Sequence, residues 1–289
     1  MALVGAGRMG GGMARRVAGA KIDLVLFNRT RATAEALGRE LGARVAGTAR
    51  EAASAADVVV SSLADDTAVK ASYEGPDGLA AGLRTGTVVL ESSTIDPATV
   101  AEMAALVEER GASLLDTPVS GSVPLLERGE LMVMAGGDPE VLERARPVLE
   151  TWASRIIHVG KTGAGATMKL AVNAVVHGLN QALAEGLVLA ERAGVERTTA
   201  YEVFASSAAA APFVLYKRPA YERPDEAPVA FSLDLSAKDF DLILALAERV
   251  GVPMDQAAVN REVARGAIAA GMGQRDLSAI AEFLRGREP

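Results

Sequence analysis

The chain has 289 residues, of which 49% are hydrophobic and 23% are charged, and its formal net charge is −7. This composition is typical of a globular protein with a sizeable core, and the length suits one large domain or two ordinary ones. The acidic balance argues against a nucleic-acid surface, zero cysteines exclude disulfides and thiolate chemistry, and two histidines are too few for a His-based metal site.

The sequence predicts a soluble, cytoplasmic protein with no membrane partner. Residues 1–16 lack the basic start and the continuous apolar core of a signal peptide. The apolar run after residue 163 is interrupted by Lys, Asn, His and Gln, which a membrane span would not tolerate.

Residues 1–160 alternate short runs of β-branched residues with helical patterns. This alternation predicts a mainly parallel sheet covered by helices. The predicted strands are 2–4, 23–27, 44–46, 58–63, 87–91, 113–115, 131–135 and 155–159. The predicted helices between them include 31–41, 97–110 and 139–152.

The first strand leads into a glycine-rich turn that fits G-x-G-x-x-G. It reads Gly5-Ala6-Gly7-Arg8-Met9-Gly10 and precedes a helical pattern. Glycines at these positions allow a tight turn and let backbone N–H groups approach a pyrophosphate. Such a turn can be only a turn, but the strand–helix–strand pattern that follows favours dinucleotide binding. We therefore predict a Rossmann-type cofactor domain over residues 1–160.

The second strand ends in Asn28-Arg29-Thr30, where a carboxylate would hold the ribose hydroxyls of NAD. A carboxylate would repel the 2′-phosphate of NADP, whereas the Arg29 guanidinium can pair with it. The alternative is that Arg29 is an ordinary solvated residue at a strand end. The residues favour NADP(H), with NAD(H) as a possible cofactor.

Later strand ends supply further candidates, because open α/β sheets bind ligands at the carboxyl edge of their strands. We place Leu63 and Thr94 among the cofactor contacts, although Thr94 or Asp96 can equally cap the helix that starts at Pro97. The turn from Asp116 to Ser122 exposes backbone N–H groups around Ser120 and Gly121, which can hold a substrate carboxylate. Taken alone, it is only a loop.

After residue 160 the pattern becomes wholly helical. The predicted helices are 163–193, 198–207, 235–250, 253–270 and 278–284, with a loop over 212–228. The composition shift at 159–163 marks a domain boundary. Residues 161–289 are thus predicted to form an all-helical substrate and oligomerisation domain, joined to the first domain by the long helix.

Lys169 is the only charge between Lys161 and Glu185. With Asn173, His177 and Asn180 it forms one polar stripe on a helix that should be buried nearly all round. A lysine removed from water loses its proton more readily, so Lys169 is a candidate catalytic acid in the cleft between the domains. A single lysine near a helix start is more often a surface group. Likewise, Lys238-Asp239 taken alone is a solvated pair.

Together these residues resemble the β-hydroxyacid dehydrogenase family, which includes 3-hydroxyisobutyrate dehydrogenase and the glyoxylate/succinic semialdehyde reductases. Residues 5–10 match the cofactor loop, 116–122 the substrate turn, 163–173 the catalytic helix and 238–239 the C-terminal motif. The resemblance implies a catalytic Lys169, with Lys238 beside the cofactor. The implied substrate-binding residues are Ser120, Gly121, Asn173, Phe231 and Asp239.

Within the family, Asn28-Arg29-Thr30, Ser120-Gly121-Ser122 and Phe231 are similar to the NADPH-dependent glyoxylate/succinic semialdehyde reductases. Ala64, Ser232 and Asp234 depart from the usual residues, so the substrate stays open among small carboxylate-bearing aldehydes, oxo acids and hydroxy acids. The alternatives are 3-hydroxyisobutyrate dehydrogenase itself, an imine reductase-like enzyme and a non-catalytic NADP-binding scaffold. Imine reductases usually carry Asp or Tyr where Lys169 stands.

The resemblance implies hydride transfer from NADPH to a carbonyl carbon, with Lys169 stabilising the charge on oxygen and donating the proton. The apolar long helix and the Ala-rich helices after it need more cover than one small domain supplies. We therefore expect a homodimer or homotetramer built through the C-terminal domain.

Overall fold

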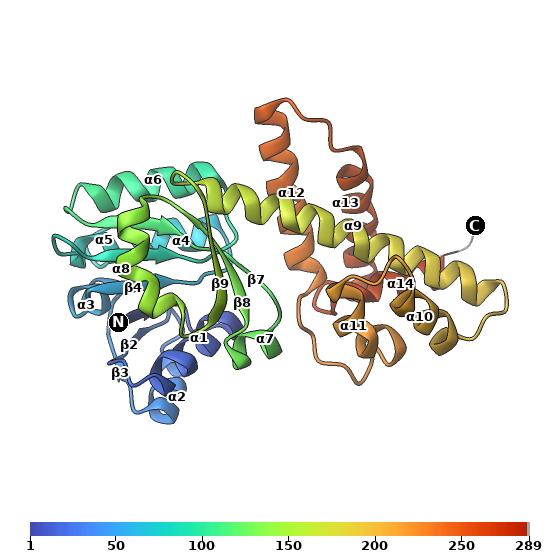
Figure 1. The fold of residues 1–289 in the computed structure, drawn as a ribbon, viewed down its shortest axis with the longest axis horizontal. Helices are drawn as coiled ribbons and strands as arrows, with labels where there is room; N and C mark the ends of the chain where they lie inside the picture. Colours follow the sequence, from blue (N-terminus) through green and yellow to red (C-terminus); the bar gives the residue numbers. More distant parts are fainter. Residues whose placement is uncertain (288–289) are drawn as a thin grey trace. The chain divides into compact units, whose positions relative to one another are not determined.

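The computed structural model describes residues 1–287, which form two compact units that divide between Lys169 and Leu170. Helix α9 (Ala164–Arg192) starts in the first unit and continues into the second (Figure 1). The predicted Rossmann-type domain, followed by an all-α domain and joined to it by a long helix, is confirmed.

The first unit is built on a nine-stranded sheet in the order β3-β2-β1-β4-β5-β6-β8-β7, with β9 beside β8. The pairs from β3 to β6 are all parallel, and the order 3-2-1-4-5-6 is that of a dinucleotide-binding sheet. The strands are β1 (Ala2–Val4), β2 (Val25–Phe27), β3 (Arg44–Val45), β4 (Val58–Ser61), β5 (Val88–Glu91), β6 (Ser113–Asp116), β7 (Val119–Ser120), β8 (Leu131–Gly136) and β9 (Ala153–Gly160).

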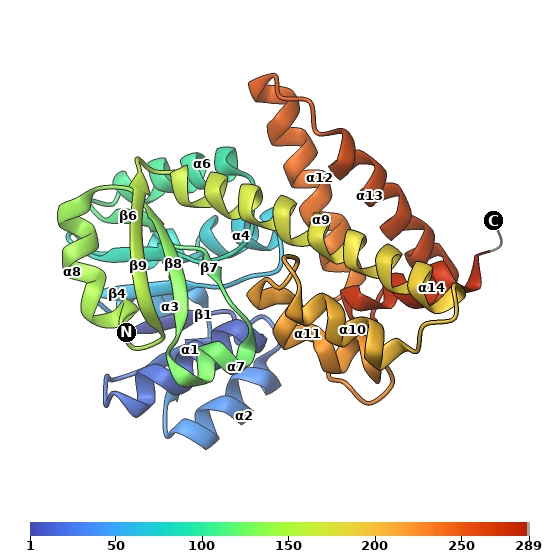
Figure 2. The ribbon, with the colours of Figure 1, turned by 45° about the vertical axis from the view of Figure 1, so that its right-hand side comes forward.

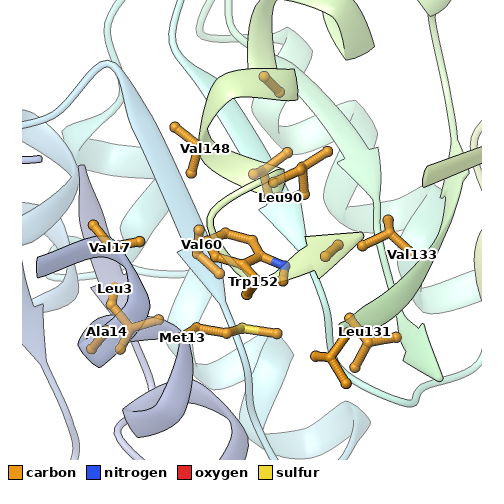
Figure 3. Close-up of a cluster of buried hydrophobic side chains, with 14 of the residues drawn as sticks. Leu3, Met13, Ala14, Val17, Val60, Leu90, Leu131, Val133, Val148 and Trp152 are labelled. Atoms are coloured by element: carbon orange, nitrogen blue, oxygen red, sulfur yellow. The ribbon is translucent and has the colours of Figure 1, made fainter. Parts of the chain in front are cut away.

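Helices cover both faces of this sheet. Successive strand residues point to opposite faces, so Leu3 and Val60 join one core while Val4 and Val59 join the other. Helices α1 (Arg8–Gly19), α2 (Arg31–Leu41), α7 (Val123–Arg128) and α8 (Pro139–Leu149) pack on the first face. Helices α3 (Ala49–Ser54), α4 (Asp66–Tyr73), α5 (Leu79–Gly82) and α6 (Pro97–Glu108) pack on the second. Figure 3 shows the first core, where fully buried Trp152 lies among Leu3, Met13 and Val60.

The second unit consists of helices around one core. They are the remainder of α9, α10 (Arg197–Ser206), α11 (Pro212–Glu222), α12 (Leu233–Val250), α13 (Asp255–Ala267), a π-helical turn (Ile268–Met272), a 3₁₀ turn (Leu277–Ala279) and α14 (Ile280–Gly286). Helices α12 and α13 run side by side in both views (Figures 1 and 2). None of the helices within residues 1–287 combines the length and hydrophobicity of a membrane span.

Two predictions about this unit are wrong. The predicted loop over 212–228 contains helix α11, which begins at Pro212 and includes Pro219. Proline disfavours a helix interior, but the buried face of α11, with Phe213, Val214 and Tyr221, stabilises it through packing.

Helix α9 is also not buried nearly all round. Val175 and Leu189 are each 72% exposed in the single chain, and Ala182 between them is exposed as well. These residues recur every seven positions and so share one face of the helix. The single chain therefore leaves an apolar stripe on α9 that its own core does not cover.

Candidate active site

The loop between β1 and α1 is a tight turn built from glycine backbone. Gly5 has a φ of +101°, and a Cβ atom there would lie 2.3 Å from the carbonyl oxygen of Ser62, so only glycine fits. Gly7 precedes α1, has no atom within 4 Å of its Cβ position, and provides no side-chain cap. The space at the Cβ position of Gly7 would allow a pyrophosphate to approach the backbone at the start of α1.

Asn28 supports this loop from the neighbouring strand. Its Oδ1 accepts a hydrogen bond from the N–H of Ala6 (3.0 Å), and its Nδ2 donates to the carbonyl oxygen of Thr30 (3.0 Å). Residues 28–30, which follow β2, contain no carboxylate, and Arg29 is the charged residue among them. Of the other predicted cofactor residues in these two turns, Arg8 and Thr30 are exposed and Met9 is half-buried.

Buried polar side chains form a row at the carboxyl ends of the central strands. Ser61, Glu91 and Asp116 are paired in register as the last residues of β4, β5 and β6. Glu91 accepts hydrogen bonds from the hydroxyl of Tyr73 and the N–H of Ser93, both at 2.8 Å. Burial raises the pKa of the Glu91 carboxyl, and these donors only partly oppose the shift.

The loops that follow β4 and β5 are tied together by one hydrogen bond. The N–H of Leu63 donates to the hydroxyl of Ser93 (2.8 Å), which places Leu63 beside the start of the segment that contains Thr94. Thr94 itself is half-buried. Asp96, the other capping candidate, accepts the N–H of Ala98 (2.7 Å) as the N-cap of α6. The cap is thus made by Asp96.

Asp116 holds the start of α9. Its two carboxylate oxygens accept the N–H groups of Gly163 (2.9 Å) and Ala166 (2.8 Å). Burial raises the pKa of Asp116, while these N–H groups act to lower it. Sequence reasoning missed this role, because Asp116 lies 47 residues before Gly163 and capping signals are read only within a helix's own first turn.

The predicted substrate turn is fastened to the edge of the sheet. Val119 and Ser120 form the short strand β7, which the sequence did not predict, and pair with Val133 and Met132 of β8. Gly121 then turns with a φ of +137° and is exposed. Ser120 therefore lies at a fixed position just before a glycine turn.

The polar stripe predicted on α9 is present. Lys169 is half-buried on the helix, one turn before Asn173. Asn173, His177 and Asn180 are all buried, with exposed fractions between 4% and 6%. The Nδ2 of Asn180 donates to the carbonyl oxygen of Leu277 (3.0 Å), so this end of the stripe is structural.

Asp239 of α12 contacts two residues of this stripe, Asn173 and His177. Its Oδ2 accepts the Nδ2 of Asn173 at 2.6 Å and lies 3.5 Å from the Nε2 of His177. Its Oδ1 lies 3.1 Å from the Nζ of Lys238, whose side chain is 23% exposed, whereas that of Asp239 is 0% exposed. The interpretation of Lys238-Asp239 as a solvated pair is therefore wrong, because α12 turns Asp239 inward against α9.

His177 and Phe231 extend this cluster. The ring of His177 lies 5.7 Å from that of Phe231 and 5.1 Å from that of Phe240, between centroids. The structure thus brings the predicted residues Asn173, Phe231 and Asp239 into one cluster around His177. The sequence placed His177 on the stripe but did not make it a site residue.

Comparison with known proteins identifies the family of the chain. Residues 1–160 match the NAD-binding domain of 6-phosphogluconate dehydrogenase, and residues 163–284 match the NAD-binding domain of NADP-dependent 3-hydroxyisobutyrate dehydrogenase. The chain belongs to the β-hydroxyacid dehydrogenase family.

Individual relatives of this dehydrogenase span nearly its whole length. It is 31% identical to 2-(hydroxymethyl)glutarate dehydrogenase of Eubacterium barkeri, covering 96% of this chain and 92% of that protein. It is 31% identical to glyoxylate/succinic semialdehyde reductase 2 of Arabidopsis thaliana, covering 98% and 78%. The structure of Mycobacterium tuberculosis 3-hydroxyisobutyrate dehydrogenase with L-serine superposes with a TM-score of 0.86 at 31% identity, covering 99% and 98%. This chain is therefore an NAD(P)-dependent oxidoreductase.

Proposed function

We propose that this dehydrogenase reduces a small carboxylate-bearing aldehyde or oxo acid of the glyoxylate or succinic semialdehyde type, using NADPH. The observation that carries the proposal is the contact of buried Asn173 and Asp239 with Lys238, one helical turn from Lys169. A non-catalytic scaffold that binds NADP has no need of such a cluster. Two of the relatives named above are named for small carboxylates: 2-(hydroxymethyl)glutarate, and glyoxylate or succinic semialdehyde.

In this proposal Lys169 is the proton donor. A bound nicotinamide nucleotide supplies the hydride. As the C–H bond forms and the carbonyl π bond breaks, negative charge grows on oxygen, and the Lys169 ammonium stabilises it and then transfers a proton. Asp239 fixes the amide of Asn173 so that it can orient the same oxygen, while the Ser120–Gly121 turn offers backbone N–H groups to the substrate carboxylate.

The preference for NADPH rests on the end of β2. The side chain of Asn28 is already hydrogen-bonded to Ala6 and Thr30. Residues 28–30 contain no carboxylate that could hold the ribose hydroxyls of NAD, and Arg29 is exposed. A guanidinium pairs well with a phosphate through its planar set of donors. A bound 2′-phosphate would thus be met by Arg29.

The test is a panel of small oxo acids and aldehydes assayed with NADPH and NADH. The panel includes glyoxylate, succinic semialdehyde, methylmalonate semialdehyde and a neutral aldehyde of similar size. We expect kcat/KM to be highest for an acid substrate with NADPH. Equal turnover of the neutral aldehyde would contradict recognition of a substrate carboxylate. A preference for NADH would contradict the proposed use of NADPH.

We also propose that the chain forms a homodimer or homotetramer through its second unit. The exposed stripe of Val175, Ala182 and Leu189 on α9 would be covered by a second copy, since exposed apolar stripes of this kind mark interfaces. Light scattering at micromolar concentration should give a multiple of the 29.8 kDa chain. Replacing Val175 and Leu189 by Glu should lower that mass, with Ala101→Glu at an exposed site of α6 in the first unit as a control. A wild-type mass of one chain would refute the assembly.

A further inference from the structure

A buried ion pair lies next to the segment that carries Phe231. The Nζ of Lys217 on α11 lies 2.6 and 2.7 Å from the two carboxylate oxygens of Asp276. Their side chains are 4% and 9% exposed. A pair this deeply buried loses most of its hydration and is a weak source of stability. Its contribution is better explained by what it holds in place.

Asp276 accepts hydrogen bonds from the segment that leads into α12. Its Oδ2 accepts the N–H groups of Ala230 (2.9 Å) and Phe231 (3.2 Å), and its Oδ1 accepts that of Ser278 (3.1 Å). The carbonyl oxygen of Phe231 accepts the N–H of Leu277 (2.8 Å). Phe231 is therefore fastened through both its N–H and its C=O to residues 276–277.

Lys217 keeps this carboxylate ionised. Burial by itself would raise the pKa of Asp276, but the charge of Lys217 and the surrounding N–H groups outweigh it, so the pKa lies below its usual value. An ionised carboxylate accepts several hydrogen bonds at once, which a protonated one does less well. The lysine thus acts on Phe231 through the carboxylate of Asp276.

Phe231 connects the tether to the candidate active site. Its ring packs on His177, whose Nε2 lies 3.5 Å from the oxygen of Asp239 that accepts Asn173. Phe231 and Asp239 therefore both contact the ring of His177. A shift of the Phe231 backbone would therefore move its ring against His177 and change the surroundings of Asp239.

We propose that Lys217 and Asp276 are positioning residues that hold Phe231 against His177 and so shape the substrate site around Asn173 and Asp239. The inference rests on the proposed function for the identity of the substrate. Loosening the pair weakens substrate binding and leaves proton donation by Lys169 in place.

Steady-state kinetics of Lys217→Met and Asp276→Asn test the inference. KM for the oxo acid should rise about tenfold while kcat changes less than about twofold, because binding geometry and not the chemical step is altered. The matched control is Arg218→Met, on the same helix, which breaks an ion pair with Glu202 at the surface and should leave both constants unchanged. A wild-type KM, or a loss confined to kcat, would overturn the inference.

Further variants separate positioning from folding. Lys217→Met leaves a buried carboxylate without its cation, whereas Lys217→Met/Asp276→Asn removes both charges and avoids that cost. If the single variant does not fold, the double variant carries the KM measurement. Lys217→Arg keeps the charge but is bulkier and differs in donor geometry, so its KM should lie between those of the wild type and Lys217→Met. A KM for Lys217→Arg above that of Lys217→Met would contradict a tether held by charge.

NMR of the histidine rings gives a readout that does not need activity. The chain has two histidines, so the His177 ring signals can be assigned, with His158 of β9 as an internal reference. Lys217→Met should shift the His177 signals, and Arg218→Met should not. If the wild type reduces none of the oxo acids, the proposed function fails, and this signal decides the inference: an unchanged His177 overturns it.

Discussion

The two units use buried carboxylates in opposite ways. In the first unit, hydroxyl and N–H groups satisfy the oxygens of Glu91 and Asp116, and burial raises the pKa values of both carboxyls. In the second unit, Asp276 is paired with Lys217, and its pKa is lowered. The same chemical group is thus shifted in opposite directions, according to whether a lysine is packed beside it.

This difference follows what each unit is proposed to bind. A dinucleotide brings its own negative charge, and the first unit offers it backbone N–H groups around Gly7 with no carboxylate nearby at the end of β2. The proposed small substrate must exchange a proton, and the second unit contains the charged pair of Asp239 and Lys238 beside Asn173. Substitutions in the glycine loop should therefore act through backbone geometry, and substitutions on α9 and α12 should act through charge.

The largest effect on activity is expected from removing the proposed proton donor, Lys169. Lys169→Ala should lower kcat by about 10²–10⁴, because a positioned proton donor contributes that much. NADPH affinity should stay nearly unchanged, since the cofactor loop is built from backbone. Single-turnover kinetics and cofactor titration measure the two quantities. A variant that keeps more than about half of wild-type kcat would remove Lys169 from the catalytic role.

Arg29 is the one charged side chain predicted to contact the far end of the cofactor, whereas the glycine loop offers backbone groups. Arg29→Ala should weaken NADPH binding by about 1.5–3 kcal/mol, the range for a hydrogen bond to a charged group. NADH, which lacks the 2′-phosphate, should bind as before. Isothermal titration with both nucleotides checks this. An equal loss for the two would show that Arg29 does not select the cofactor.

Two glycines of the same loop should respond differently to alanine. Gly5→Ala should destabilise the unliganded protein by about 1–3 kcal/mol, because its φ of +101° and the nearby oxygen of Ser62 exclude a Cβ. Gly7→Ala meets open space and should leave the melting temperature unchanged while weakening NADPH binding. Thermal melts and titration separate the two. A lower melting temperature for Gly7→Ala without ligand would show that the methyl group disturbs the protein itself, which would contradict open space for the cofactor at Gly7.

The smallest expected effect concerns Glu91 and pH. Its folded-state pKa lies above the ordinary 4.5, so its contribution to stability is fully present below the unfolded pKa and is lost as pH rises through the folded pKa. Glu91→Gln removes this dependence. Between the two pKa values, the free energy of unfolding of Glu91→Gln should rise relative to that of the wild type by about 1.4 kcal/mol for each pH unit. Denaturant melts across that pH range measure this difference. A difference that grows as the pH is lowered would contradict the prediction.

Local patterns determined much of this protein. The alternation of strands and helices, the glycine turn at 5–10 and the long helix around Lys169 all follow from spacing within a few residues, and the structure has each of them. The stripe of Asn173, His177 and Asn180 was visible for the same reason, because helical periodicity places residues on one face. These features need no knowledge of distant partners.

Only the tertiary structure decided which groups meet. Asp116 caps a helix 47 residues away, Asp239 turns inward to Asn173 across 66 residues, and Lys217 meets Asp276 across 59. Helix α11 forms despite Pro219 because its other face is buried. Periodicity specifies which face of an element is apolar, whereas the partner of a buried charge depends on how separate elements pack. That packing is set by the whole core, and no short stretch of sequence contains it.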